Sequence, residues 1–318
     1  AYVAVKQGHQ PDAHSLIAIA NPMNSEIRFL DVKKAMLGEV SVMNPASDDL
    51  KFWREIPASS LTITDIDYNG GYLYVAGLSN GEFASTMRKI AYPFDGTQHS
   101  VKSIEIYHAV HVQNETRAPI RTMLFDEING ESTLIASYTC TPLVVIPTAD
   151  ITNNSDVVGK TIAELGYGNA PIDMINIMTQ APEGGYVKQL LITHKNRGGT
   201  LIPYDAIATG AKGKGMAGMR AQAPAGLDNM LSMPTASIMQ IDNQNQMMVT
   251  VLRRNMDNGG IELVSQLTGV FLRLSDFIAE YDFPDYEYGE GQEFTKKFHE
   301  MIKPLEGFPE LASKGAKE

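Results

Sequence analysis

The same order of short strands and turns recurs several times along this sequence, and this repetition constrains the fold more than any other feature. Three copies, at residues 63–94, 120–151 and 172–207, each join two apolar, alternating stretches through a polar turn. A fourth copy begins near Thr235, and a partial copy occupies residues 15–32. The predicted turns are Asn69-Gly70-Gly71, Asn129-Gly130, Glu183-Gly184-Gly185 and Asp242-Asn243-Gln244. Such self-similarity is typical of folds assembled from one repeated supersecondary unit.

Each copy is predicted to form an antiparallel β-sheet, because Asn-Gly between alternating apolar runs favours a tight hairpin. The copies begin roughly 50 to 60 residues apart, which fits four strands per sheet if residues 100–108 form an outer strand. A four-stranded sheet cannot bury both faces alone, and radial stacking against its neighbours solves this. We therefore expect an all-β fold, a β-propeller of four-stranded blades. At least five repeats are visible, and seven blades are predicted. The alternative is a β-sandwich with coincidental turn similarity.

The last part of the chain differs in character from the repeats. Residues 281–318 are acidic and aromatic and are interrupted by Pro and Gly, with one short helical stretch at about 293–303. We expect a propeller domain at residues 1–280 and a loosely docked C-terminal tail at residues 281–318.

Composition excludes some classes of protein. The net charge is −11 and no cluster of Lys and Arg forms a basic face, so a nucleic-acid partner is not expected. No run approaches the ~18 apolar residues that a membrane helix needs. The chain begins with Ala rather than Met, which is compatible with a removed leader. Its one cysteine, Cys140, cannot form an internal disulfide.

Several segments resemble a family of exported bacterial β-propeller proteins of unassigned function. The resemblance covers most of residues 60–210. The matching residues are 73–80, 82–86 and 92–94, then Tyr107, His108, His111, Glu115, Thr116 and 118–122, and finally Ala136, 138–144 and 159–166. The resemblance implies a periplasmic or extracellular location but no particular reaction. Family members often have histidine where this chain has Arg117, which weakens an inherited metal site.

In a propeller, the loop between the second and third strands of a blade opens on the same face as the loop between blades. Function commonly resides in such loops, which a rigid scaffold holds. The repeats place residues 79–82, 139–141, 194–197 and 253–255 in the first class of loop, and residues 108–119 and 164–173 in the second. We expect this face to bind a ligand or partner through Glu82, Glu115, Arg121, Cys140, His194, Asn196 and Arg197.

A metal site is a further hypothesis for this face. His108 and His111 have ligand-like spacing, and Glu115 and either Cys140 or His194 lie nearby in the predicted ring. Imidazole, carboxylate and thiolate suit copper or zinc, and calcium is a third candidate. Residues three apart on a strand point to opposite sides, so both imidazoles reach one ion only if the chain bends. Otherwise these histidines are polar loop residues that bond to neighbouring blades.

Three functions are compatible with this pattern. The first is an exported binding or scaffolding propeller that holds a partner protein or small ligand. The second is a metal-assisted, lactonase-like hydrolase that uses channel residues. The third is an accessory subunit of a periplasmic redox complex. The channel candidates are Asp65, Glu82, Asn169, Asp173 and Asn196. Cys140 could act as a nucleophile only with a base such as His108 or His194, and a buried, inert thiol is the alternative.

Overall fold

The structure is a computed structural model in which strands dominate the described part of the chain. It describes residues 1–7, 14–21, 24, 26–52, 56–96, 98–153, 157–181, 183–195, 198–219, 223–233, 235, 238–254, 260–268 and 293. The predicted all-β class is confirmed. Apart from Glu293, the predicted tail lies outside the described residues. None of the described helices is long and apolar enough to cross a membrane.

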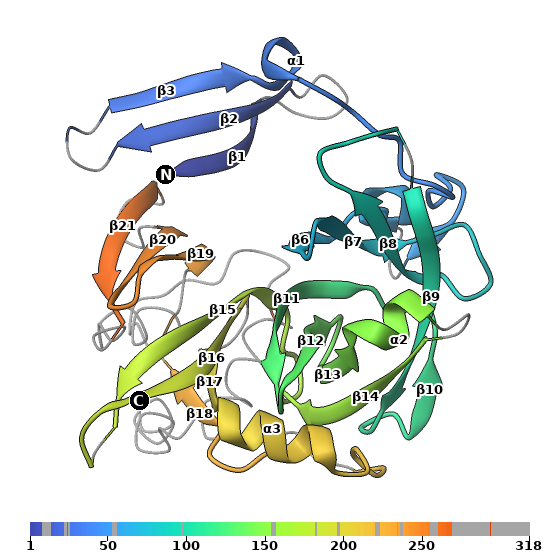
Figure 1. Ribbon diagram of the computed structural model, residues 1–318, viewed down its shortest axis with the longest axis vertical. Helices are drawn as coiled ribbons and strands as arrows, with labels where there is room; N and C mark the ends of the chain where they lie inside the picture. The colour runs from blue at the N-terminus through green and yellow to red at the C-terminus, as the bar shows by residue number, and fades with distance from the viewer. Residues whose placement is uncertain are drawn as a thin grey trace.

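Five antiparallel groups of three or four strands, called sheets below, follow one another along the chain around a centre (Figure 1). The second and third belong to one nine-stranded sheet, and β4 and β5 form a separate two-stranded sheet. The first sheet contains β1 (Tyr2–Gln7), β2 (His14–Asn21) and β3 (Glu26–Asp31). The second contains β6 (Asp65–Asn69), β7 (Tyr72–Leu78), β8 (Ser85–Ala91) and β9 (Gln98–His108), and the third contains β11 (Ile120–Ile128), β12 (Glu131–Tyr138), β13 (Pro142–Pro147) and β14 (Val157–Glu164). The fourth contains β15 (Pro171–Gln180), β16 (Tyr186–His194), β17 (Gly199–Pro203) and β18 (Leu231–Met233), and the fifth contains β19 (Ile238–Asn245), β20 (Met248–Arg254) and β21 (Ile261–Leu267).

Short elements complete the described chain. They are α1 (Val32–Ala35), β4 (Lys51–Phe52), β5 (Ile56–Pro57), the 3₁₀ helix η1 (Ala58–Leu61), β10 (Gln113–Glu115), α2 (Thr148–Asn153) and α3 (Tyr204–Lys212). Outer strands β9 and β14 pair in parallel, with Val157 opposite Ile104, and so join the second and third sheets at their outer edges. The expected outer strand at residues 100–108 is therefore present, as β9. The described residues contain five such groups of three or four strands, and the blade number of seven stays a prediction.

Adjacent sheets pack face to face through buried apolar clusters. One cluster joins Tyr74 and Met87 of the second sheet to Leu134 of the third. A second joins the third and fourth sheets, and a third joins the fourth and fifth. The rings of Tyr74 and Phe125, 4.5 Å apart between centroids, show this stacking. The third and fourth sheets therefore bury both faces against neighbours, which is the propeller-like packing that the repeats predict.

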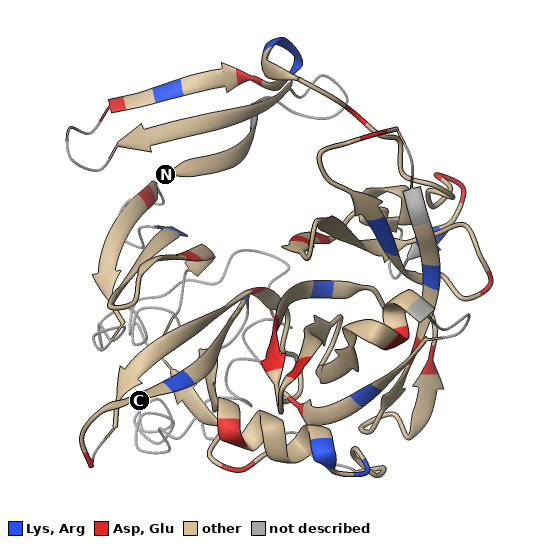
Figure 2. Cartoon of the chain, in the orientation of Figure 1, with Lys and Arg blue, Asp and Glu red and all other residues tan. Residues whose placement is uncertain are grey.

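The innermost strands line a central cavity of about 900 Å³, to which β1, β6, β11, β15 and β19 contribute. Aspartates on these strands accept hydrogen bonds from the backbone of the next sheet. Asp65 Oδ2 accepts from Met123 N at 2.7 Å, and Asp173 Oδ2 accepts from Ile241 N at 2.9 Å. Acidic residues accordingly mark β6 beside the centre (Figure 2). The carboxylates satisfy N–H groups of inner strands that lack a partner strand on that side.

The hairpin turns have the backbone that the sequence predicts. Asn129 and Gly130 have φ of 55° and 83°, and glycine pairs provide the equivalent turns of the second and fourth sheets. Along β11 and β12, Ile128 pairs with Glu131 at the turn, whereas Ile120 pairs with Tyr138 at the other end. Gly130 and Cys140 therefore lie at opposite ends of the third sheet, as expected. In the fifth sheet the predicted turn is wrong, since Asn245 pairs with Met248 and the chain reverses after residue 245.

Candidate functional site

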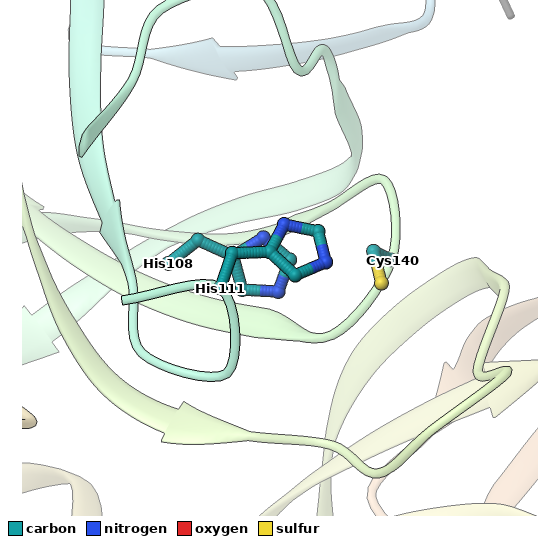
Figure 3. A group of neighbouring side chains, drawn as sticks. All are labelled: His108, His111 and Cys140. Carbon is teal, nitrogen blue, oxygen red and sulfur yellow. The ribbon is translucent and has the colours of Figure 1, made fainter. Parts of the chain in front are cut away.

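A tight bend after β9 brings His108 and His111 together. His108 ends β9, and β10 runs back along it, with Gln113 opposite His108. Between the two strands, Val112 adopts a left-handed φ of 56°. The bend turns both imidazoles to one side, and their ring centroids are 3.8 Å apart (Figure 3). Because the chain bends here, both imidazoles can reach one ion, as they could not on a straight strand.

Glu115 contacts both imidazoles through one oxygen of its carboxylate. Its Oε1 atom is 2.9 Å from His108 Nδ1 and 2.6 Å from His111 Nδ1. The side chain of Gln113 also donates to this oxygen, at 3.1 Å. The Nδ1 atoms of both histidines consequently converge on one point beside a carboxylate oxygen.

Cys140 joins the cluster from the turn between β12 and β13. Its φ of 80° is left-handed, which is uncommon for a residue with a side chain. One donor atom each from His108, His111 and Cys140 lies within 4.8 Å of the other two (Figure 3). His108 is fully buried, Cys140 is partly buried and His111 is exposed, so the cluster opens to solvent on one side. Two sheets thus supply three donors of the kind that transition metals prefer.

Glu164, the first residue of the predicted loop 164–173 but not among the predicted binding residues, lies beside this cluster. It ends β14 and is 1% exposed. Its Oε2 accepts a hydrogen bond from the Thr141 hydroxyl and lies 3.7 Å from His108 Nε2. Its Oε1 accepts from Ala109 N at 2.7 Å. The sequence signal was its position at a strand end, directly before the connection between two sheets.

The charges of these groups are strongly coupled. Burial alone would lower the pKa of His108, but hydrogen bonds to Cys140 and Glu115, with the charges of Glu115 and Glu164, raise that pKa to about 10. Burial alone would raise the pKa of Glu115, but hydrogen bonds from His108, His111 and Gln113 lower it to about 2. Without a metal ion, His108 and Glu115 therefore form an ion pair at neutral pH.

Other predicted face residues lie at varying distances from this cluster. Glu82 is exposed in the connection between β7 and β8, and its carbonyl oxygen accepts from Arg117 Nε at 3.2 Å, shortly after β10. His194 is buried at the end of β16, where its Nε2 is 2.9 Å from Thr200 Oγ1, so it belongs to the fourth sheet. Asn196 and Arg197 lie outside the described residues.

Arg121, another residue predicted for the binding face, lies on an inner strand of the third sheet. It lies at an irregularity between Ile120 and Thr122 of β11, where the register shifts, and its side chain is exposed. Solvent can therefore satisfy its charge, and no buried carboxylate is needed.

The residues predicted to line the channel also lie in different places. Asp65 and Asp173 line the central cavity, whereas Asn169 is buried beside His194, with its Nδ2 atom 3.4 Å from His194 Nε2. Burial raises the pKa of Asp65 and of Asp173 to about 6 each, although backbone N–H groups on both carboxylates oppose this shift. Those N–H groups occupy both oxygens of each carboxylate, which favours a structural role over direct chemistry.

Comparisons with known proteins add little to this description. No protein-family model matches the chain, and no curated protein matches it. Among solved structures, the crystal structure of an ancestral GH74 enzyme matches with a TM-score of 0.33 and 12% sequence identity. The match covers 82% of this chain and 35% of that enzyme's chain. A likeness at this level supports no conclusion about fold or chemistry.

Proposed function

We propose that this protein is a propeller-type binding protein whose loop face holds a transition-metal ion through His108, His111 and Cys140. The observation that carries the proposal is the convergence of these three donor atoms within 4.8 Å of one another. The ligands come from the bend after β9 and from the turn between β12 and β13, which a rigid pair of joined sheets holds in place.

The donor set favours copper or zinc over calcium. Imidazole nitrogen and thiolate sulfur suit borderline and soft ions, whereas calcium takes oxygen ligands. A carboxylate oxygen of Glu115 is available as a fourth donor, since it already lies within 2.9 Å of both Nδ1 atoms. An ion here would replace the protons that the imidazoles share with Glu115, and its positive charge would compensate the carboxylate and the thiolate.

The exposed side of the cluster suits the binding role that the repeats suggest. The side chain of His111 is 47% exposed, and the connection containing Glu82 contacts Arg117, two residues after Glu115. A small ligand or a partner protein could approach the ion from this side. An exported location remains part of the proposal, on the resemblance alone.

Metal analysis of the purified protein tests the proposal. After incubation with Zn²⁺ or Cu⁺ and removal of free ion, we expect about one ion per chain, with specific binding measured by calorimetry. The double variant His108→Ala, His111→Ala should lose this ion. A matched control is His14→Ala, which removes an exposed histidine on β2. Full metal content in the double variant, or no bound ion in the natural chain, would refute the assignment.

A further inference from the structure

Glu164 is a buried carboxylate that the proposed metal ligands themselves do not include. Burying a carboxylate is costly unless hydrogen bonds satisfy it. The backbone of Glu164 is held in place by two hydrogen bonds with Ala225, both at 2.9 Å. A residue so firmly held can position whatever bonds to its side chain.

One oxygen of Glu164 holds the bend between the two histidines. Oε1 accepts from Ala109 N at 2.7 Å and lies 3.4 Å from Val110 N. These are the residues that directly follow His108 and precede His111. The carboxylate therefore fixes the turn that sets the relative position of the two imidazoles.

The other oxygen fixes the orientation of the His108 ring. The Thr141 hydroxyl donates its single proton to Glu164 Oε2, so its oxygen can only accept from His108 Nε2, which lies 3.0 Å away. Nε2 must therefore carry a proton, and Nδ1 is the nitrogen left to bind an ion. Thr141 also follows Cys140 directly, so the same contact positions the cysteine turn.

We infer that Glu164 is the positioning residue of this centre, holding the bend after β9 and the Cys140 turn in the geometry that binds a metal ion. The inference rests on the proposed function for its ligand. It assigns to Glu164 and Thr141 the outer-shell role of fixing a ligating histidine through its second ring nitrogen.

Two pairs of variants test this role, with Zn²⁺ as the probe. Glu164→Gln keeps the size of the side chain but removes its charge and one acceptor oxygen. Thr141→Val removes the hydroxyl link, whereas Thr141→Ser keeps it. The control is Glu127→Gln, at an exposed position on β11.

We expect Glu164→Gln and Thr141→Val to weaken Zn²⁺ binding by about 10- to 100-fold with unchanged stoichiometry. Thr141→Ser and the control should stay within about twofold of the natural chain. Co²⁺ gives a second readout, because the thiolate-to-cobalt absorption should shift in the two impaired variants. Zn²⁺ affinity within about twofold in both Glu164→Gln and Thr141→Val would overturn the inference.

Failure of the proposed function is recognised separately. If the natural chain binds no Zn²⁺ or Co²⁺, the metal assignment falls, and the side-chain ¹⁵N NMR spectrum of His108 decides the positioning role. A protected Nε2–H signal that Thr141→Val and Glu164→Gln abolish supports positioning. A signal that both variants leave unchanged overturns it.

Discussion

Asp65 and Asp173 line the central cavity and should make the stability of the ring depend on pH. Burial raises the pKa of each from 3.8 to about 6. The neighbouring charge of Asp173 adds to the shift of Asp65, and that of Asp242 adds to the shift of Asp173. A carboxyl group whose pKa is higher in the folded than in the unfolded state stabilises the fold in its protonated form. That stabilisation is complete below the unfolded pKa of 3.8 and is lost as the pH rises through 6.

The size of the effect follows from these values. Between pH 4.5 and pH 6.5, each group should lower the free energy of unfolding by about 2 kcal/mol, and the two together by at most about 4 kcal/mol. Burial also raises the pKa of Asp67, which acts in the same direction. The window avoids the His108–Glu115 pair, because their folded pKa values are about 10 and about 2. Stability from that pair is fully present only between the two unfolded values, 4.5 and 6.5.

Urea unfolding followed by circular dichroism at pH 4.5, 5.5 and 6.5 measures this dependence. The midpoint should fall as the pH rises. The double variant Asp65→Asn, Asp173→Asn should be much less sensitive to pH, even though each amide keeps one acceptor oxygen and loses the other. A free energy of unfolding that is constant or rises with pH over this window would show that the inner carboxylates are not desolvated as described.

Three shorter predictions concern other parts of the chain. Gly130→Val should lower the free energy of unfolding in urea by about 1–3 kcal/mol through backbone strain alone, because the turn needs φ of 83° and an added Cβ would meet open space. Gly130→Asn should lower it less, and an equal loss in the two variants would contradict this reason. Arg88→Met should cost about 3 kcal/mol or more by the same assay, since the buried guanidinium donates to four backbone carbonyls, and a loss under about 1 kcal/mol would contradict the role. Alkylation of Cys140 by iodoacetamide should slow when Zn²⁺ is added, and an unchanged rate would place the thiol outside the metal site.

Local features of the sequence predicted the repeated sheets well. Asn129-Gly130 and the glycine pairs need only their own backbone preferences to form a hairpin, so the pattern of residues contains the information. The fifth sheet was misjudged for a non-local reason. Asp242 and Asn243 look like turn residues, but they continue an inner strand, and Asn243 Nδ2 donates to Asn176 O of the neighbouring sheet at 3.0 Å.

The candidate site was predictable as a set of residues and not as an arrangement. The spacing of His108 and His111 is typical of metal ligands, yet on a straight strand residues three apart point to opposite sides. The bend that joins them depends on Glu164, 55 residues away from Ala109. No pattern within the segment reveals that partner. The exposed position of Arg121 likewise depends on a register shift between strands, which periodicity alone does not show.

Buried carboxylates accept hydrogen bonds from otherwise unpaired backbone N–H groups in two parts of this protein. Where sheets meet at an angle, some backbone N–H groups lie beyond the reach of any partner strand, and an acidic side chain from the next sheet can accept from them. Asp65 and Asp173 do so between inner strands, and Glu164 does so at the bend after β9. At the inner strands one oxygen bonds to the backbone of the next sheet and the other to the backbone of the following residue in the same strand. At Glu164 one oxygen is left over for Thr141, and through it for His108. That remaining acceptor is what could turn a contact between sheets into the support of a metal centre.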